Sequence, residues 1–259
     1  MPNTPLRLER EGAIARIVFS RPQQLNAINI DTANAFDAAC ETIERDDSVR
    51  VVVIRGEGSS FGVGGDLRAF QQSPQPTALA LIEPMHRGLQ RLTRMAAPVL
   101  ASLQGNVSGG SMSLAMACDL AIAADDVRFN LAYVNVAASC DVGGSWHLTR
   151  LLGMRRAMEI ALLGTTMTAN EAQRLGLVNQ VVPTSELDSA TDALAVRLAN
   201  GPTAAYGRLK RLIRVAQTND LSTQLDLERD GFYESAGTAD FNEALQAFFE
   251  RRPPKFVGR

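Results

Sequence analysis

Short apolar runs alternate along this chain with longer stretches in which apolar residues recur every three or four positions. Short apolar runs bounded by turn residues are typical of buried strands. They occupy residues 13–19, 49–54, 98–103, 120–123, 127–129 and 178–182. Helical patterns separate several of these runs, so the chain is expected to be an α/β protein with a strand–strand–helix rhythm.

The helical patterns begin in the first half of the chain. Apolar residues recur at helical spacing over residues 36–43 and again over 81–92. Between them, residues 67–72 are expected to form a short helix. The polar, proline-containing stretch 71–76 that follows is expected to be a mobile surface segment, with Thr77 capping the next helix.

The middle of the chain carries several helix boundary signals. A helix is expected to start at residues 143–144, and glycines are expected to close three helical segments, at Gly153, Gly164 and Gly176. Thr168 and Glu171 have the spacing of a capping box, in which each side chain satisfies a backbone N–H of the first helical turn.

Strand patterns are absent after residue 186, where four helical segments follow. Breaks are expected at residues 201–202, 219–220 and at Gly237. These segments carry more large apolar residues than so few helices can bury among themselves, so packing on the core and on other subunits is expected. We therefore divide the chain into a core, residues 1–185, and a C-terminal helical oligomerisation region, residues 186–259.

Two glycine-rich loops each follow a predicted strand and precede a predicted helix. The first lies at residues 56–65 and the second at residues 104–110, with Gly109 and Gly110 at its end. Glycine lets a backbone turn sharply and approach a ligand, and a helix that starts near Gly110 directs free N–H groups into that space. Such loops either form tight turns only or aim two N–H groups at one ligand oxygen.

Composition narrows the classes of partner. The net charge is −2 with a pI near 5.8 and scattered cationic residues, which disfavours nucleic acid as a partner. No apolar run has the length of a membrane span and the first twelve residues lack a signal-peptide pattern, so we expect a cytoplasmic protein. Three cysteines without C-x-x-C spacing and two histidines favour neither disulfides nor a metal site.

Four segments carry a resemblance to a known family. RPQQLNA at residues 21–27 resembles the pattern R-P-x-x-x-N-A, and FGVGGDL at residues 61–67 resembles F-x-x-G-x-D-L. Residues 105–119 resemble G-x-x-x-G-G-x-x-x-x-L-x-x-x-C-D, and the LG at residues 152–153 with the GLV at residues 176–178 falls in the family's order. The chain is therefore similar to the enoyl-CoA hydratase/isomerase, or crotonase, superfamily over nearly its whole length.

This resemblance implies a crotonase fold, a spiral of ββα repeats closed by a C-terminal helical trimerisation region. It implies an acyl-CoA thioester as ligand, coenzyme A as part of the substrate, no permanently bound cofactor, and a homotrimer or a dimer of trimers. Gly65 and Gly110 would donate their N–H groups to the thioester oxygen. The resemblance places coenzyme A near Leu25, Ala27, Gly64, Asp66, Arg251 and Lys255, the last two reaching from a neighbouring subunit.

The sequence departs from the family's hydratases at two positions. Where those enzymes carry two glutamates that activate water, this chain has Ser113 and Tyr133. Both side chains are neutral at pH 7, so no carboxylate pair remains to take and return the protons of water. Hydration of a 2-enoyl-CoA is therefore not expected, and a double-bond isomerase is favoured.

The remaining carboxylate in the catalytic segment is Asp141, just before the helix expected at residues 143–144. Its loop resembles that of acyl-CoA isomerases, in which the matching aspartate moves protons, and the alternative is that it only caps the helix. The spacing of His86 and Asp141 also resembles that of the base and the nucleophilic aspartate in 4-chlorobenzoyl-CoA dehalogenase, which would imply hydrolytic chemistry. The alternative is that His86 is an ordinary helix residue. His147 is expected to be only a packing residue. A noncatalytic acyl-CoA binding protein and an assembly partner also stay open.

Overall fold

The computed structural model describes residues 4–259, and its centre is a mostly parallel sheet. The strands, in their order across the sheet, are β1 (Leu6–Glu11), β2 (Ile14–Phe19), β3 (Val51–Gly56), β4 (Val99–Leu103), β6 (Leu120–Ala124) and β9 (Gln180–Val182). Strands β1 and β2 pair antiparallel and every other pair is parallel. Strands β3 and β4 are apolar almost throughout, as expected for strands covered on both faces.

A second, smaller sheet lies beside the first. It consists of β5 (Asn106–Ser108), β7 (Arg128–Asn130) and β8 (Met167–Thr168). Strands β5 and β7 pair in parallel, and β7 pairs antiparallel with β8. Strand β5 leads directly into α3 (Gly110–Ala117), so this sheet positions the second glycine loop.

Helices cover the sheets. In chain order the remaining core helices are α1 (Ile30–Glu44), α2 (Pro74–Arg94), α4 (Gly144–Leu163), α5 (Ala169–Arg174) and α6 (Leu187–Ala199). Phe36 of α1 packs on Phe19 of β2, with ring centroids 6.1 Å apart. Helix α6 packs on the main sheet, where Ser102 and Thr191 share a buried hydrogen bond of 2.8 Å. The core is therefore continuous from β1 to α6.

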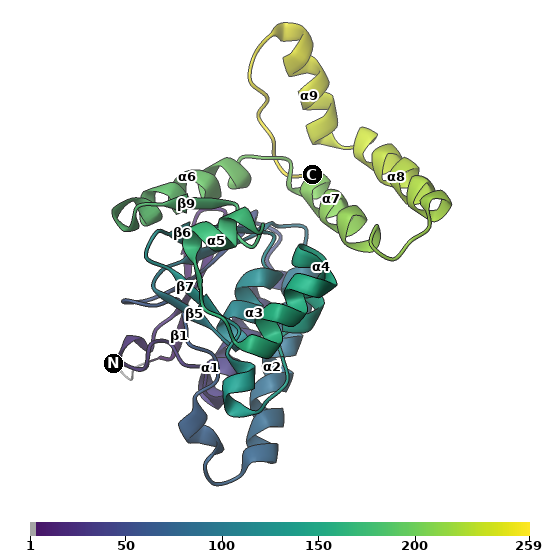
Figure 1. The fold of residues 1–259 in the computed structure, drawn as a ribbon. Helices are drawn as coiled ribbons and strands as arrows, with labels where there is room; N and C mark the ends of the chain where they lie inside the picture. Colours follow the sequence, from purple (N-terminus) through teal and green to yellow (C-terminus); the bar gives the residue numbers. More distant parts are fainter. Residues whose placement is uncertain (1–3) are drawn as a thin grey trace.

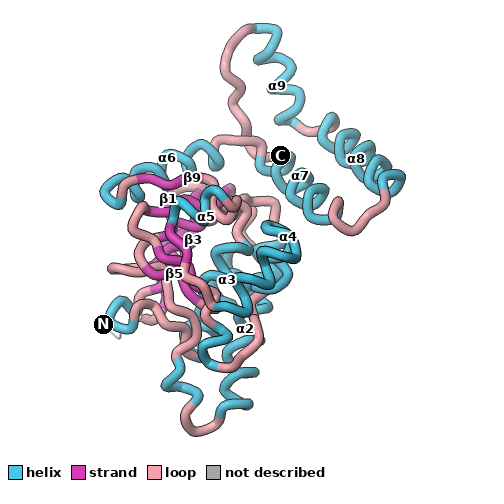
Figure 2. The backbone as a smooth tube through the Cα atoms, in the orientation of Figure 1, coloured by secondary structure: helices cyan, strands magenta, loops and turns pink. Residues whose placement is uncertain are grey.

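Three further helices extend away from the sheets (Figure 1), namely α7 (Thr203–Val215), α8 (Leu221–Ala236) and α9 (Ala239–Glu250). All the strands lie in the other part of the molecule (Figure 2). Large apolar side chains of these helices are exposed, among them Ile213 at 67%, Phe232 at 67% and Phe248 at 76%. The predicted breaks at residues 201–202, 219–220 and Gly237 separate these helices as expected.

The end of the chain returns to the start of α7. Arg50 donates to the carbonyl oxygens of Gly201 and Phe256, the latter over 3.1 Å, and to the Thr203 hydroxyl over 3.1 Å. The buried carboxylate of Asp240 accepts from backbone N–H groups of residues 257 and 258, over 2.6 and 2.8 Å. The three helices and the tail therefore form a closed arm.

Most predicted elements are confirmed, with instructive exceptions. Strands β1, β5 and β8 were not predicted. Strands β5 and β8 are only three and two residues long, too short to show a pattern, and the exposed side of β1 is mainly charged. Within α4, Gly153 has φ 74° and ψ 164°, so the predicted break is a kink after which the helix continues. The capping box of Thr168 and Glu171 is present.

The prediction for the stretch before α2 is wrong. Helix α2 begins at Pro74, so much of the segment predicted to be mobile is helical. Proline is tolerated in a first helical turn because its missing N–H has no partner there in any helix. The Thr77 hydroxyl does not cap α2 but donates to the Ala69 carbonyl over 3.3 Å.

No helix of residues 4–259 is long and apolar enough to cross a membrane. Within the same residues, no group of three or more histidine, cysteine or acidic side chains is arranged to hold a metal ion.

Candidate active site

The two glycine loops lie side by side and are joined by backbone pairing. The Gly62 N–H donates to the Asn106 carbonyl over 3.1 Å, and the Ser108 N–H donates to the Gly62 carbonyl over 2.9 Å. The Gly64 N–H donates to the Ser111 hydroxyl of α3 over 3.1 Å. The first loop therefore extends the small sheet beyond β5.

The N–H group of Gly65 faces away from the backbone pairing beside it. A parallel bridge pairs it with Ile28, in which the Ile28 N–H donates to the Gly64 carbonyl over 2.7 Å and the Asp66 N–H to the Ile28 carbonyl over 2.9 Å. In such a bridge the N–H of the middle residue, here Gly65, faces away from the partner. It has no hydrogen-bond partner among residues 4–259 and is free to donate to a ligand.

Gly110 is the first residue of α3, as predicted. The preceding Gly109 has φ 52°, a backbone region that side chains disfavour, and its N–H donates to the Asn130 carbonyl over 3.0 Å. The first N–H groups of a helix have no partner within it, and that of Gly110 has none in the described part of the chain. A Cβ at Gly64 would lie 3.1 Å from the Gly110 nitrogen, so the loops are in contact at this point.

The carboxylate of Asp141 lies next to Gly110. A Cβ built on Gly110 would be 3.4 Å from Asp141 Oδ1 and 3.7 Å from the Tyr133 hydroxyl. The ring of Phe70 lies 3.7 Å from the corresponding position on Gly65. The structure thus brings Asp141, Tyr133 and Gly110 together, with Phe70 beside Gly65.

A chain of hydrogen bonds leads from α3 to Asp141. The Tyr133 hydroxyl donates to Asp141 Oδ1, and the Ser113 hydroxyl lies 3.1 Å from the Tyr133 hydroxyl. Since the tyrosine proton goes to the carboxylate, Ser113 is the donor in the second bond. This arrangement occupies Oδ1 of Asp141 and leaves Oδ2 as its other acceptor oxygen.

Burial controls the protonation of these groups. It raises the pKa of Asp141, while the hydrogen bond from Tyr133 acts in the opposite direction. Burial also raises the pKa of Tyr133 well above its usual value, and the charge of Asp141 adds to this effect. Asp141 is therefore the titrating group of the pair and Tyr133 stays a neutral donor.

His86 reaches the same segment from α2. Its Nε2 accepts a hydrogen bond of 3.1 Å from the Val142 N–H, directly after Asp141. The resemblance drew attention to His86 and Asp141, and the structure brings His86 to the backbone beside Asp141. No pattern in the sequence predicted the bond to Val142.

The loop that carries Leu25 and Ala27 is fixed by motif side chains. Arg21 pairs with Asp66 over 3.0 Å, and the buried Asn26 amide donates to the Ser60 carbonyl over 2.7 Å. The carboxylate of Asp66 therefore joins the loop of residues 21–27 to the end of the first glycine loop. Leu25 is 40% exposed and Ala27 is buried. The arginine, asparagine and aspartate of the two sequence motifs were a signal for this internal bonding.

Arg251 and Lys255 lie apart from this site. Arg251 is the residue after α9 and Lys255 belongs to the tail, and both are exposed. Figure 1 shows α9 at the far end of the arm, away from α3. Within one subunit they do not join the glycine loops, so a role for them at the site requires a second copy of the chain.

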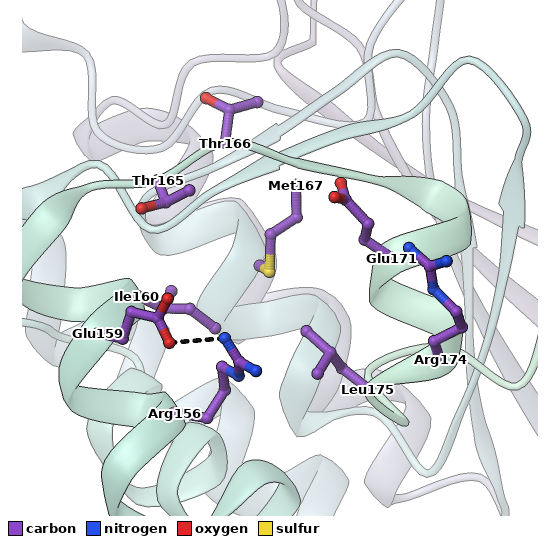
Figure 3. A pocket seen from close by; sticks show the side chains of 9 residues that line it. All are labelled: Arg156, Glu159, Ile160, Thr165, Thr166, Met167, Glu171, Arg174 and Leu175. Atoms are coloured by element: carbon purple, nitrogen blue, oxygen red, sulfur yellow. Dashed lines mark hydrogen bonds and ion pairs between the residues drawn. The ribbon is translucent and has the colours of Figure 1, made fainter.

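Two cavities border different parts of the core. One of about 520 Å³ is lined by side chains of α2, α4 and α7, including His86, Trp146 and Arg214, and adjoins the Asp141 segment through His86. The other, of about 370 Å³, lies between α4 and α5 and contains the ion pair of Arg156 and Glu159 (Figure 3). The predicted site residues do not line the second cavity, so it is not part of this site.

Nearly the whole chain matches a known protein family. The profile of the family described as enoyl-CoA hydratase/isomerase matches residues 9–259. The chain belongs to this family. It is 36% identical to the 1,2-epoxyphenylacetyl-CoA isomerase of Escherichia coli, with 96% of this chain and 97% of that protein covered. It is 32% identical to the short-chain-enoyl-CoA hydratase of Clostridium acetobutylicum, with 95% and 94% covered.

Solved structures of the enoyl-CoA hydratase/isomerase family confirm the fold. An enoyl-CoA hydratase from Polaromonas sp. JS666 superimposes with a TM-score of 0.91 at 32% identity, covering 97% of this chain and 99% of that one. The crotonase fold predicted from the motifs is therefore confirmed. Relatives of similar identity carry hydratase and isomerase names, so the family membership does not select the reaction.

Proposed function

We propose that this protein is an acyl-CoA double-bond isomerase in which Asp141 moves the proton. The observation that supports this most is the contact of Asp141 with Gly110, where a Cβ would be 3.4 Å from the carboxylate. A proton acceptor beside an oxyanion donor lies next to the carbon atoms that adjoin a bound thioester carbonyl. The carbonyl makes the C–H bonds of these carbon atoms acidic, and an isomerase uses this acidity to remove a proton.

The proposed reaction begins with the thioester oxygen between the N–H groups of Gly65 and Gly110. Asp141 takes a proton from the carbon next to the carbonyl, and the electron pair of the C–H bond moves toward the oxygen to form a dienolate. The two N–H groups stabilise the charge, and each such donor typically contributes about 3–4 kcal/mol in enzymes of this kind. Asp141 then returns the proton to the carbon two positions further along, which shifts the double bond.

The side chains around Asp141 suit a reaction with a single base better than they suit hydration. Ser113 is completely buried and bonded to Tyr133, whose proton goes to Asp141. Neither is a second carboxylate that could activate water. The raised pKa of Asp141 brings it closer to a base that both accepts and releases a proton near neutral pH.

Hydrolytic chemistry that uses His86 as a base is the second candidate, because the structure places His86 against the residue that follows Asp141. The Nε2 of His86, however, already accepts the Val142 N–H. A histidine needs a free ring nitrogen within reach of water to act as a general base. This favours the isomerase.

The deciding experiment replaces Asp141 by asparagine, which keeps the shape and removes the base. Double-bond migration in 3-enoyl- or dienoyl-CoA, followed by absorbance, should fall by a factor of about a hundred or more. Asp47→Asn, at an exposed carboxylate, is the matched control and should keep the rate. A normal rate in Asp141→Asn, or rapid hydration of 2-enoyl-CoA without isomerisation, would show that the assignment is wrong. Acyl-CoA binding without turnover would favour the binding-protein alternative.

We also propose that the protein assembles as a trimer or a dimer of trimers. The motivation is the exposed apolar surface of the arm, where Leu209, Ile213 and Phe232 line a groove of about 490 Å³ between α7 and α8. Apolar surface of this kind is typical of a subunit interface. Assembly would also allow Arg251 and Lys255 to reach the coenzyme A phosphates of a neighbour. Light scattering tests this directly, and a monomer at micromolar concentration would exclude it.

A further inference from the structure

The bond between His86 and Val142 defines the state of the imidazole. His86 Nε2 accepts from the Val142 N–H over 3.1 Å, so this nitrogen carries a lone pair and no proton. A neutral imidazole then carries its proton on Nδ1. Protonation of Nε2 would put two donors face to face and break the bond.

Val142 has a backbone conformation that its side chain disfavours. Its φ is 48°, in the left-handed region, where a β-branched residue is a rare outlier. Such a conformation is strained and persists only where surrounding contacts hold it. Its side chain is buried at 1% exposure and its N–H is held by His86. The burial of the side chain and the hydrogen bond of the N–H both oppose a change of φ at Val142.

The direction in which the Asp141 carboxylate points depends on the backbone conformation of Val142. Asp141 precedes Val142, and Gly143 follows it with φ 73° before α4 begins. A change of φ at Val142 rotates the chain on one side of it relative to the other. With α4 fixed, relaxation would change the position of the Asp141 carboxylate relative to Gly110.

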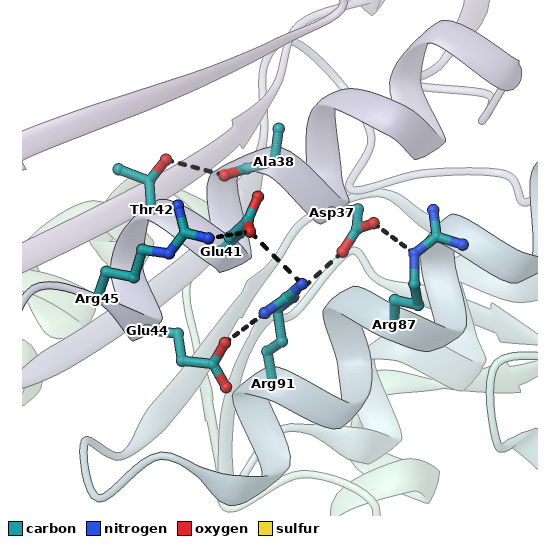
Figure 4. A network of polar contacts seen from close by, with 8 residues as sticks. All are labelled: Asp37, Ala38, Glu41, Thr42, Glu44, Arg45, Arg87 and Arg91. Atoms are coloured by element: carbon teal, nitrogen blue, oxygen red, sulfur yellow. Dashed lines mark hydrogen bonds and ion pairs between the residues drawn. The ribbon is translucent and has the colours of Figure 1, made fainter.

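The helix that carries His86 is anchored on the side facing α1. Arg87 donates to Asp37 over 2.7 Å, and Arg91 pairs with Asp37 and Glu44 (Figure 4). Gly88 has no side chain, and a Cβ there would lie 2.6 Å from the Phe36 ring, so α1 and α2 are in close contact. His86 is therefore presented from a fixed support.

We propose that His86 is a positioning residue, which holds Val142 in its left-handed conformation through Nε2 and thereby aims the Asp141 carboxylate at the substrate. The proposal rests on the function of Asp141 proposed above. It assigns His86 no proton transfer with the substrate, unlike a catalytic base. It requires only a hydrogen-bond acceptor at the position of Nε2.

The charges around His86 come from three elements. Asp141 faces it from the segment before α4, while Arg94 of α2 and Arg214 of α7 line the cavity that His86 borders. His147 of α4 lines the same cavity, and burial, assisted by nearby arginines, lowers its pKa to about 4. His147 therefore stays neutral above about pH 5.

Two substitutions test the proposal. His86→Leu removes the acceptor, whereas His86→Gln places an amide oxygen near the position of Nε2 and does not titrate. In His86→Leu we expect kcat to fall about tenfold to a hundredfold with KM nearly unchanged, since a displacement of about 1 Å has effects of this size. His86→Gln should restore most of that rate.

Hydrogen exchange of the Val142 amide provides a readout that does not depend on the reaction. Exchange should accelerate in His86→Leu and remain slow in His86→Gln, with both variants folded by circular dichroism. An unchanged Val142 amide or an unchanged kcat in His86→Leu would overturn the proposal. Equal loss of kcat in both variants would identify His86 as a proton-transfer group instead. If Asp141→Asn were fully active, the proposed reaction would fail, while the exchange data would still report on the Val142 contact.

Discussion

The two halves of the candidate site use left-handed backbone in different ways. In the glycine loops, Gly64, Gly105 and Gly109 have positive φ, and none has a side chain to resist it. In the Asp141 segment, Ala132, Ala137 and Val142 adopt the same region although each has a Cβ.

The difference lies in what sets each conformation. Glycine permits the loop conformation by residue type, so the glycine half of the site is determined locally. The Asp141 half depends on distant contacts such as that of Val142 with His86, 56 positions away. We therefore expect the glycine half to be insensitive to pH and fragile to added volume, and the Asp141 half to respond to pH and to the loss of single hydrogen bonds.

The largest effect is expected from Gly110→Val. A Cβ at this position meets no atom closer than 3.4 Å, so the fold should persist while the side chain occupies the space beside Asp141. Loss of an oxyanion donor lowers kcat by about 10²–10³, and affinity should change much less. Steady-state kinetics and acyl-CoA titration measure the two separately.

Gly64→Ala is the structural counterpart to Gly110→Val. Gly64 has φ 87°, and a Cβ there would lie 3.1 Å from both the Gly110 nitrogen and the Ser108 carbonyl oxygen. This variant should lose thermal stability together with activity. Equal destabilisation of Gly110→Val and Gly64→Ala would contradict the separation of the two roles.

Tyr133→Phe should change the pH profile of the Asp141 half. The hydrogen bond from Tyr133 lowers the pKa of Asp141, against the raising effect of burial, so its loss should raise that pKa further. The active base is the carboxylate, and the rate falls as the pH falls through its pKa. The acid limb of kcat/KM should therefore move to higher pH, with a drop of about tenfold at neutral pH. Tyr233→Phe, on the exposed face of α8, is the control. An acid limb that stays in place would count against the coupling.

Asp141→Asn should make the protein more stable at pH 8. Burial raises the pKa of Asp141 in the folded state, so above that pKa the folded protein holds a carboxylate that the unfolded chain solvates better. Asparagine removes this cost, and Tm should rise by roughly 2–4 °C. The gain should disappear at a pH below the unfolded pKa of about 3.9, where the carboxyl is protonated in both states. A stability gain that does not depend on pH would point to another cause.

Ala137→Gly should produce the smallest change. Ala137 is exposed and has φ 55° at the end of the short 3₁₀ helix Tyr133–Val136. Glycine accepts this conformation without strain, although the unfolded chain gains freedom, so a net gain of no more than about 1 kcal/mol is expected. Urea unfolding measures it, and kcat should not change. A loss of stability would show that the segment is less strained than its backbone indicates.

The sequence predicted the glycine half of the site better than the Asp141 half. The start of α3 at Gly110 and the closeness of the two loops follow from glycines placed between apolar runs. The contact of His86 with Val142 could not be predicted, because it depends on how α2 packs on α1. The segment between Tyr133 and Asp141 contains one left-handed residue, Ala137, and its residue type gave no indication of this conformation.

The elements of the fold also divide into those that the local sequence predicts and those that depend on distant neighbours. Strands β2, β3 and β4 and the C-terminal helices have apolar patterns that predicted them, whereas the mainly charged β1 does not. Strands β5 and β8 owe their pairing to neighbours across the small sheet, and too few residues form them to show a period. The start of α2 was predicted too late because proline was interpreted as a break, whereas in a first turn it favours a helix.

The closed arm has a mechanical consequence. Arg50, in the core before β3, holds the carbonyl groups of Gly201 and Phe256 at the two ends of the arm. A pulling force applied to the end of the chain would therefore divide between Asp240 of α9, which holds residues 257 and 258, and the contacts of Arg50 with the core. In a protein immobilised by its C-terminus, α9 and the core would carry the load together, and α8 would be loaded only after these contacts broke.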